Sequence, residues 1–226
     1  MHVVLSVGGS SVNPKGEPDL GFLRSLAKMI KKSKNKFGIL TGGGSIARVY
    51  AKAARALGAT EYEADSIAIT STKQNAQLVI AALKCAGIDV YPKLIGDFEE
   101  ARGLSNKVVV MGGTIPGITT DTDAVLLGEA IGAARLVNIS NVDAIYDSDP
   151  RKNKSAKKYA KMSYEQLITL ATSSDQRKAG THFVFDLLAC KLIARSKMEA
   201  HFVSGKSERE IENAIEGKKH NGTVVI

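Results

Sequence analysis

The chain has 226 residues, of which 44% are hydrophobic, and a formal net charge of +8. This length allows one large domain or two small ones, with enough apolar residues for a sizeable core. Its apolar runs all fall short of the roughly 20 residues that a membrane-spanning helix needs, and the first residues are predicted to form a strand rather than a signal peptide. These features predict a cytoplasmic protein with no membrane partner.

The positive charge does not by itself predict nucleic-acid binding. Basic residues are spread along the chain, and aromatic residues make up only 5%. The lysine-rich stretches at 28–36 and 151–161 are typical of solvated surface, although the second lies near a candidate nucleotide loop and could attract a polyphosphate. Cys85 and Cys190 lack CxxC spacing and the four histidines are scattered, so we expect buried reduced thiols and no zinc site.

Short apolar runs alternate with segments of helical periodicity along the whole sequence. The predicted strands are Val3–Val7, Phe37–Leu40, Val90–Leu94, Lys107–Met111, Leu136–Ile139, Ala200–Val203 and Thr223–Ile226. The predicted helices are Asp19–Lys32, Ser45–Leu57, Ser66–Ala86, Asp121–Ala134, Ser163–Thr172, Phe183–Ser196 and Glu208–Glu216. Apolar strands separated by helices indicate a mostly parallel sheet covered on both faces. We therefore predict an α/β fold, a three-layer α/β/α sandwich forming a single domain over residues 1–226.

Four loops follow predicted strands and have unusual compositions: 6–11, 40–48, 111–124 and 140–150. In open parallel sheets, ligands bind beyond the carboxyl ends of the strands. In the first loop, the amides of Gly8 and Gly9 with the Ser10 hydroxyl could cradle phosphate oxygens, although an ordinary turn is equally compatible. In the second loop, three glycines precede a helix N-terminus, which favours anions. Arg48, about one turn into that helix, is expected to turn inward toward a phosphate.

The third loop contains more glycine and threonine than a capped turn needs. Thr120 or Asp121 alone would cap the next helix, so the surplus of bare backbone and hydroxyl groups indicates a ligand with several oxygens. The fourth loop could be an ordinary turn rich in Asn and Asp. Its functional interpretation is an adenine–ribose clamp, with Tyr146 as a flat apolar face and Asp143 helping to hold a magnesium ion.

Two common nucleotide-binding motifs are missing from the sequence. The segment AHFVSGKS has Ala200 where a Walker A loop has its first glycine, so we interpret it as a plain strand–helix turn. GxGxxG does not occur either, which argues against a nicotinamide or flavin site.

Taken together, these segments resemble the amino-acid-kinase superfamily and, within it, the archaeal-type uridylate kinases. The resemblance runs in order through essentially the whole chain, in VGGSS, TGGGSIAR, ADSIAITSTKQNAQLVIAAL, VVVMGGTIPGITTDTDAVLL, SNVDAIYDSDP, AGTHFVFDLLACKLIARS and NGTVVI. The pairing of ADSIAIT…N with MGGTIPGITTD points to a uridylate acceptor. The resemblance implies Mg²⁺-dependent transfer of the ATP γ-phosphoryl group to UMP in pyrimidine nucleotide biosynthesis, by a homo-oligomer that is a hexamer.

The resemblance also implies roles for individual residues. The ATP-binding residues would be Gly8, Gly9, Ser10, Gly44, Arg48, Ser140, Asn141, Tyr146 and Asp149. The UMP-binding residues would be Gly43, Asp65, Gly113, Thr114, Ile115, Pro116, Gly117, Ile118 and Thr119, although Asp65 could also cap a helix starting at Ser66. The catalytic residues would be Arg48, Asp143 and Asp186, with Asp186 organising a magnesium ion that is carried mainly by the ATP phosphates. The N-terminal part of the domain would then bind mainly UMP, and the C-terminal part mainly ATP.

Several positions depart from the pattern of that family. Ser6 and Ser45 stand where many members have lysine, Lys73 replaces an arginine, and Ala68 and Ala144 replace glycines. These changes bear on the rate and on the choice among UMP, CMP and dUMP. Two alternatives therefore stay open: another small-molecule kinase on the same scaffold, and a non-catalytic nucleotide or oxyanion binder.

Overall fold

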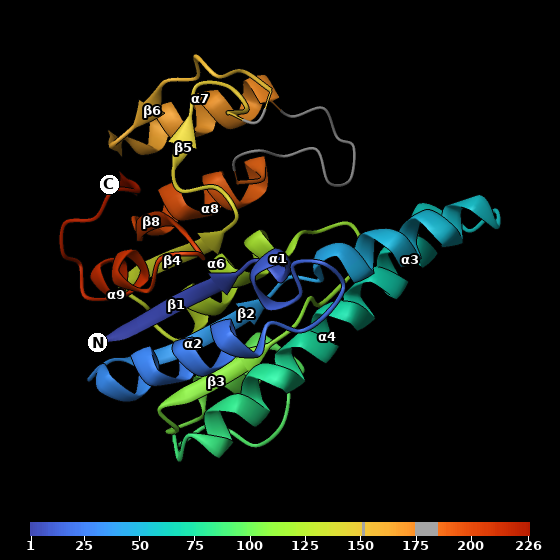
Figure 1. Ribbon diagram of the computed structural model, residues 1–226, viewed down its shortest axis with the longest axis vertical. Helices are drawn as coiled ribbons and strands as arrows, with labels where there is room; N and C mark the ends of the chain where they lie inside the picture. Colours follow the sequence, from blue (N-terminus) through green and yellow to red (C-terminus); the bar gives the residue numbers. More distant parts are fainter. Residues whose placement is uncertain (151, 175–184) are drawn as a thin grey trace.

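The computed structural model describes residues 1–150, 152–174 and 185–226, and a parallel-rich sheet lies at its centre (Figure 1). Across this sheet the strands run in the order β3 (Val108–Met111), β2 (Lys36–Thr41), β1 (His2–Val7), β4 (Arg135–Ser140), β8 (Glu199–Ser204), β9 (Thr223–Val225) and β7 (Lys161–Met162). Every neighbouring pair is parallel except β8 and β9, which are antiparallel. A separate antiparallel pair joins β5 (Ile145–Tyr146) to β6 (Lys158–Tyr159).

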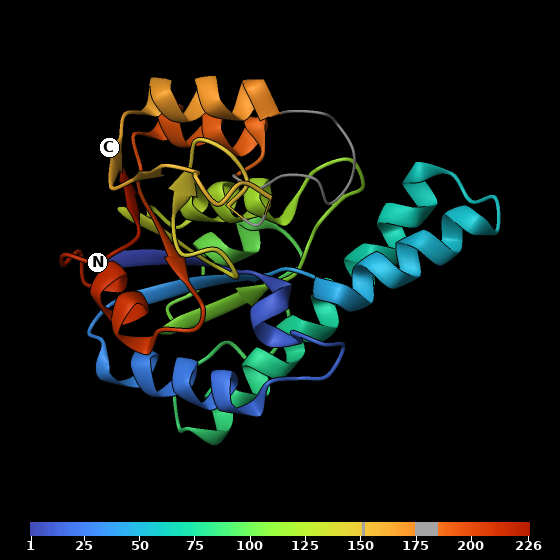
Figure 2. The ribbon, with the colours of Figure 1, turned by 45° about the horizontal axis from the view of Figure 1, so that its top comes forward.

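Helices cover both faces of the sheet (Figures 1 and 2). Within the described residues they are α1 (Gly9–Val12), α2 (Leu20–Lys32), α3 (Gly44–Ala56), α4 (Glu61–Cys85), α5 (Phe98–Arg102), α6 (Thr120–Ala130), α7 (Tyr164–Ser174), α8 (Leu187–Ser196) and α9 (Glu208–Ile215). Residues from α2, α4 and α9 pack on one face, and residues from α6, α7 and α8 lie on the other. This arrangement confirms the predicted α/β fold with a mostly parallel sheet between helical layers.

The strands are apolar on both sides because both faces of the sheet are buried. Leu5 of β1 packs into the core under α2 and α4, whereas its neighbour Val4 packs into the core under α6. Both side chains are completely buried. Alternation of side chains between two apolar layers is what a continuous apolar strand predicts.

One predicted strand is wrong. Val90–Leu94 makes only an isolated bridge from Val90 to Val108, with single backbone hydrogen bonds from Tyr91 and Ile95 to β3. Pro92 lies in the middle of this run and has no N–H to donate, so a continuous ladder cannot form there.

The long helix α4 begins five residues earlier than predicted. The hydroxyl of Thr60 accepts from Glu63 N (3.3 Å), and the Glu63 carboxylate accepts from Thr60 N (2.8 Å). This reciprocal capping box fixes the start of the helix at Glu61. The expectation that Asp65 caps a helix starting at Ser66 is therefore wrong, and its carboxylate is free to act elsewhere.

Two smaller expectations also need correction. Cys190 is buried, and burial raises the pKa of its thiol, but Cys85 is exposed at the end of α4. The predicted helix from Phe183 begins at Leu187, where Asp186 caps it, and residues 183–184 lie outside the described residues.

Across 1–150, 152–174 and 185–226, none of the helices combines the length and apolarity that crossing a membrane requires.

A chain of hydrogen bonds links the segment before β9 to β8. Gly222 N–H donates to His220 Nδ1 (3.0 Å), which leaves His220 Nε2 as the donor to His201 Nδ1 (2.6 Å). His201 Nε2 then donates to Glu199 Oε1 (2.5 Å), which also accepts from Arg135 Nε (3.1 Å). Burial lowers the pKa of His201 to about 4, although the Glu199 carboxylate acts in the opposite direction. His201 is thus held neutral in the folded protein.

Acid should therefore destabilise the fold through His201. An unperturbed histidine binds its proton near pH 6.5, whereas folded His201 does so only near pH 4. Between these values the unfolded chain binds more protons than the folded chain, so the free energy of unfolding falls as the pH falls. A shift of this size corresponds to roughly 3 kcal/mol. Urea denaturation over this pH range measures the slope, and a constant free energy of unfolding would contradict a neutral His201.

Candidate active site

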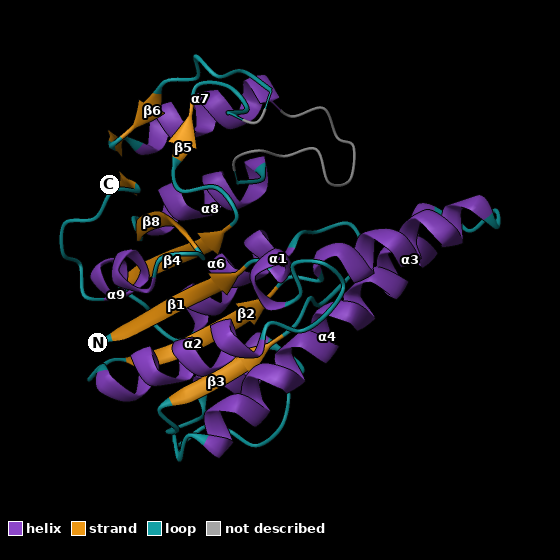
Figure 3. Ribbon diagram, in the orientation of Figure 1, coloured by secondary structure: helices purple, strands orange, loops and turns teal. Residues whose placement is uncertain are grey.

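A cleft is lined by residues of the loops after β1, β2 and β4 and of the start of α6. Figure 3 shows the strands of the sheet and the loops between the strands and helices. The volume of the cleft is about 340 Å³. We call it the strand-end cleft. Nine of the predicted site residues line it: Gly8, Gly9, Ser10, Gly43, Gly44, Arg48, Thr119, Ser140 and Asn141. Residues from four separate loops therefore converge, as expected for carboxyl ends of adjacent parallel strands.

The glycines of the first two loops are required by the packing of one loop on the other. A Cβ atom on Gly9 would lie 2.0 Å from Gly44 N and 2.6 Å from Gly42 O. Gly44 has φ +68°, and a Cβ there would lie 2.0 Å from Asn13 Oδ1. Because only glycine permits this approach, the two loops form one continuous backbone surface at the edge of the cleft.

Two buried asparagines brace that backbone surface, and sequence reasoning gave neither of them this role. Asn13 Nδ2 donates to Asn75 Oδ1 (2.9 Å), and Asn75 Nδ2 donates to the carbonyl of Gly42 (2.7 Å). The Ser45 hydroxyl donates to the carbonyl of Asn13 (3.3 Å). The long helix α4, which carries Asn75, thereby fixes the position of the second glycine loop.

Asp121 is the acidic group of the strand-end cleft. Its Oδ1 accepts from the Ser6 hydroxyl (3.1 Å) and from Asn138 Nδ2 (3.4 Å). Burial, together with the negative charge of Asp186, raises the pKa of Asp121 to about 7, although the Ser6 hydrogen bond lowers it. Ser6 and Asn138 are paired neighbours on β1 and β4, so the register of the sheet places both beside this carboxylate.

The cap of α6 differs from the prediction. The Thr119 hydroxyl, rather than Thr120 or Asp121, accepts from the backbone N–H groups of Asp121 and Thr122 (both 3.2 Å). Asp121 is thereby released from capping and turns toward the cleft. Sequence reasoning therefore gave Asp121 a structural role and missed its place in the site.

Asp186, a predicted catalytic residue, does not line the strand-end cleft. It is buried and caps α8, where its carboxylate accepts from Ala189 N (3.0 Å). It also accepts from the hydroxyl groups of Thr119 and Thr122. These contacts tie the start of α8 to the start of α6 and leave Asp186 acting on the cleft through its charge on Asp121.

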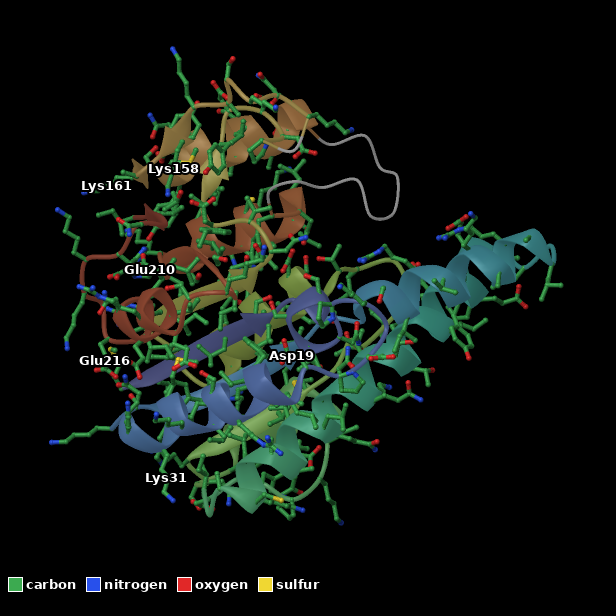
Figure 4. The ribbon with its side chains drawn as sticks, in the orientation of Figure 1. Asp19, Lys31, Lys158, Lys161, Glu210 and Glu216 are labelled. Carbon is green, nitrogen blue, oxygen red and sulfur yellow. The ribbon has the colours of Figure 1, made fainter. Side chains whose placement is uncertain are left out.

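The fourth loop contributes its apolar side chains to the cleft, in Val142, Ala144 and Ile145. Asp143, predicted to be catalytic, instead accepts hydrogen bonds from the Tyr146 hydroxyl (2.8 Å) and from Lys158 Nζ (2.8 Å). Figure 4 labels Lys158 on β6. Burial raises the pKa of Asp143, but these hydrogen bonds outweigh that effect and hold the pKa below its usual range.

Tyr146 and Asp149, predicted to bind ATP, are not among the residues that line the cleft. The phenol of Tyr146 is engaged with Asp143, and the Asp149 backbone carbonyl accepts from Lys152 N (3.0 Å) and Asn153 N (2.8 Å). These residues lie farther along the fourth loop, which continues into the β5–β6 pair.

The predicted acceptor segment, residues 113–119, is held by side chains of two helices. From α4, Thr72 Oγ1 accepts from Gly113 N (2.6 Å), and Asp65 Oδ2 accepts from Gly117 N (3.0 Å). From α6, Asp123 accepts from both Thr114 N (3.1 Å) and Thr114 Oγ1 (2.6 Å). We call this segment the acceptor loop. Its anchors reach it from opposite sides.

In and just before the acceptor loop, one side chain is exposed and two glycines are required by the backbone conformation or by close packing. Ile115 is exposed, and Gly117 has φ +89° with no atom within 4 Å of a built Cβ, so glycine there serves backbone conformation. Gly112, just before the loop, packs so closely on α4 that a Cβ would lie 2.8 Å from Lys73 N. Part of the glycine surplus therefore serves packing against α4.

Comparison with known proteins identifies the family. The model of the amino acid kinase family matches residues 1–204. The chain belongs to the amino acid kinase family. Among curated members, it is 43% identical to the uridylate kinase of Archaeoglobus fulgidus, with 100% of both chains covered. It is 42% identical to the uridylate kinase of Methanocaldococcus jannaschii, covering 100% of this chain and 99% of the relative.

Solved structures of the family agree with the fold. The crystal structure of the Archaeoglobus fulgidus uridylate kinase superimposes with a TM-score of 0.86 at 41% identity, covering 100% of both chains. The UMP kinase of Bacillus anthracis has a TM-score of 0.82 over 99% of this chain and 95% of its own, but only 22% identity. The second likeness supports the fold alone.

Substitution of Gly9 by alanine should separate the two glycine loops. The new Cβ would collide with backbone atoms of Gly42 and Gly44, so we expect a loss of roughly 2–3 kcal/mol in the free energy of unfolding. Gly103→Ala is the matched control, because Gly103 has φ −82° and its Cβ would meet only one atom at 3.8 Å. Chemical denaturation compares the two variants, and equal stabilities would contradict the close contact.

Proposed function

We propose that this member of the amino acid kinase family is a uridylate kinase, which transfers the γ-phosphoryl group of ATP to UMP and releases UDP and ADP. The observation that carries the proposal is the end-to-end match with proteins named uridylate kinase, at 43% and 40% identity for two of them. The strand-end cleft supports it, because backbone amides, hydroxyl groups and an arginine converge there as polyphosphate binding requires.

In this proposal the first two loops bind the ATP phosphates. Gly8, Gly9, Ser10 and Gly44 supply backbone and hydroxyl donors, and Arg48 supplies a positive charge at the same cleft. Ser140 and Asn141 contact the nucleoside, next to the apolar side chains of the fourth loop. Tyr146 and Asp149, farther along that loop, are proposed to reach the base and ribose.

UMP is proposed to bind between α4 and the acceptor loop. Gly43 lies at the cleft edge, and Asp65 presents a carboxylate suited to a pair of ribose hydroxyls. The backbone from Gly113 to Thr119 surrounds the nucleotide. Thr114 already uses both its N–H and its hydroxyl hydrogen on Asp123, so it can meet UMP only as a hydrogen-bond acceptor.

Magnesium is proposed to accompany ATP, and the residues present fit this ion. Mg²⁺ is usually held by one or two carboxylates together with substrate phosphates. Asp121 is such a carboxylate, because it lines the cleft and its ionised form is destabilised by burial and by Asp186. When bound, the ion would neutralise part of the phosphate charge. Asp143 and Asp186 have their oxygens engaged by other side chains and fit this task less well.

Catalysis requires placement and charge neutralisation rather than proton abstraction. The attacking phosphate of UMP is already ionised near neutral pH, so a general base is unnecessary. The fixed glycine amides, the α3 N-terminus and Arg48 stabilise negative charge on the transferred group. The acceptor loop and Asp65 hold UMP in line with that group.

The same proposal extends to the setting of the protein. We infer that it acts in the cytoplasm in pyrimidine nucleotide biosynthesis, as a homo-oligomer that is a hexamer. Light scattering of the purified protein measures the oligomeric state directly.

An acceptor panel tests the proposed activity. We expect ADP release in the presence of Mg²⁺ and ATP to be fastest with UMP, slower with CMP and dUMP, and absent with acetylglutamate or isopentenyl phosphate. A comparable rate with either of the last two would favour another small-molecule kinase of the family. Binding of UMP and ATP by calorimetry without UDP formation would instead indicate a non-catalytic nucleotide binder.

The variant Asp121→Asn tests the acidic group of the cleft. It keeps the shape of the side chain and removes its charge, so kcat should fall on the order of a hundredfold while the fold is retained. Steady-state kinetics over a range of Mg²⁺ concentrations measures the effect. Asp97→Asn, which changes a carboxylate that caps α5, is the matched control. Unchanged kcat for Asp121→Asn at every Mg²⁺ concentration would remove this residue from the mechanism.

A further inference from the structure

Asp123 is a buried carboxylate that the proposed reaction does not use directly. It lies in the first turn of α6 and is 1% exposed. Burying a carboxylate is costly unless donors compensate it, and an apolar residue would fill the same space at lower cost. We therefore expect the role of Asp123 to lie in the groups that its hydrogen bonds hold in place.

Within the part of the chain that the structure describes, the donors to the Asp123 carboxylate come from one residue of the acceptor loop. Thr114 N–H donates to Asp123 Oδ2 (3.1 Å), and the Thr114 hydroxyl donates to Asp123 Oδ1 (2.6 Å). Each carboxylate oxygen thus holds one Thr114 donor. The pair fixes both the backbone and the side-chain torsion of Thr114, nine residues earlier in the chain.

The acceptor loop depends strongly on such side-chain anchors. Among the described residues, no backbone–backbone hydrogen bond is donated by residues 113–118. On the α4 side, the loop is held by Thr72 at Gly113 and by Asp65 at Gly117. Of these, Asp65 is partly exposed and is proposed to share its carboxylate with the ribose of the acceptor. Asp123 and Thr72 are the anchors for which no such second role is proposed.

The three neighbouring side chains of the first turn of α6 have separate contacts. Asp121 lines the strand-end cleft, Thr122 donates to Asp186 at the start of α8, and Asp123 holds the acceptor loop. Residues two apart on a helix point to different sides. The first turn of α6 therefore contributes both to the strand-end cleft, where ATP is proposed to bind, and to the acceptor loop, where UMP is proposed to bind.

We propose that Asp123 is a positioning residue for the acceptor substrate: through Thr114 it holds the acceptor loop in the conformation that receives the nucleoside monophosphate, without touching the substrate itself. This inference rests on the proposed function and deepens it. It separates Asp123 from Asp121 two residues earlier, whose charge acts on the phosphates.

The variants Asp123→Asn and Thr114→Val test the inference by steady-state kinetics. In Asp123→Asn, an amide NH₂ replaces one oxygen and faces a Thr114 donor, so kcat/KM for UMP should fall at least about tenfold. Thr114→Val removes the hydroxyl, both as the donor to Asp123 and as the acceptor proposed for UMP, and should lower kcat/KM for UMP in the same direction. The KM for ATP should stay near that of the unchanged protein in both, and Asp97→Asn serves as control.

The double variant adds a test of the pair. If Asp123 acts through Thr114, the effects on kcat/KM for UMP will be less than additive in Asp123→Asn/Thr114→Val. Equal changes in the KM values for UMP and ATP, or full additivity, would overturn the positioning role. If Asp123→Asn fails to fold, Thr114→Val, which retains the backbone donor to Asp123, is compared by hydrogen–deuterium exchange without nucleotide: faster exchange over residues 112–120 supports the anchor, and unchanged exchange contradicts it.

Hydrogen–deuterium exchange separates this inference from the proposed activity. In protein with no nucleotide added, Asp123→Asn should speed exchange over residues 112–120 relative to both the unchanged protein and Asp97→Asn. Unchanged exchange there would contradict the anchor even in an active uridylate kinase. Conversely, faster exchange in a protein that fails to phosphorylate UMP would leave the anchor standing and reject the proposed substrate.

Discussion

The backbone of Gly9 lies directly against the backbone of Gly42 and Gly44, and the shape of the strand-end cleft depends on this contact. Strands β1 and β2 end side by side, but any side chain between their loops would force them apart. With glycine on both sides, amides from two loops face one volume and are fixed before a ligand arrives, which is the condition for electrostatic stabilisation. The entropy lost by ordering glycines is offset in part by Asn13 and Asn75, which hold the second loop to α4.

Three carboxylates, those of Asp121, Asp123 and Asp186, are gathered around the start of α6. Burial raises the pKa of both Asp121 and Asp123, and the negative charge of Asp186 adds to both effects. The positive end of the helix dipole and the capping Thr119 make this acidic cluster tolerable. Each carboxylate has its own hydrogen-bond partners: Asp121 has Ser6, Asp123 has Thr114, and Asp186 has Ala189. The cluster therefore connects the cleft, the acceptor loop and the start of α8.

The sequence predicts the sheet, most helices and the four converging loops, because apolar strands and glycine clusters are local patterns. The capping box of Thr60 and Glu63 is also local, and recognising it would have placed the start of α4 correctly. The setting of Asp121 is different, because its partner Ser6 is 115 positions away and the contact exists only through the register of the sheet. For the same reason Asp143 has the sequence context of a metal ligand, while folding pairs it with Lys158.

The last strand of the sheet imposes an order on folding. Strand β9 lies between β8 and β7, so β7 cannot join the sheet until residues 223–225 have emerged from the ribosome. The Thr223 hydroxyl also accepts from Ile145 N (2.8 Å), which ties this strand to a residue of the cleft wall. Contacts so distant in sequence form late because the intervening chain must first be ordered. The wall of the strand-end cleft that contains Ile145 would thus be assembled last during synthesis, after the parallel strands β1 to β4 have paired.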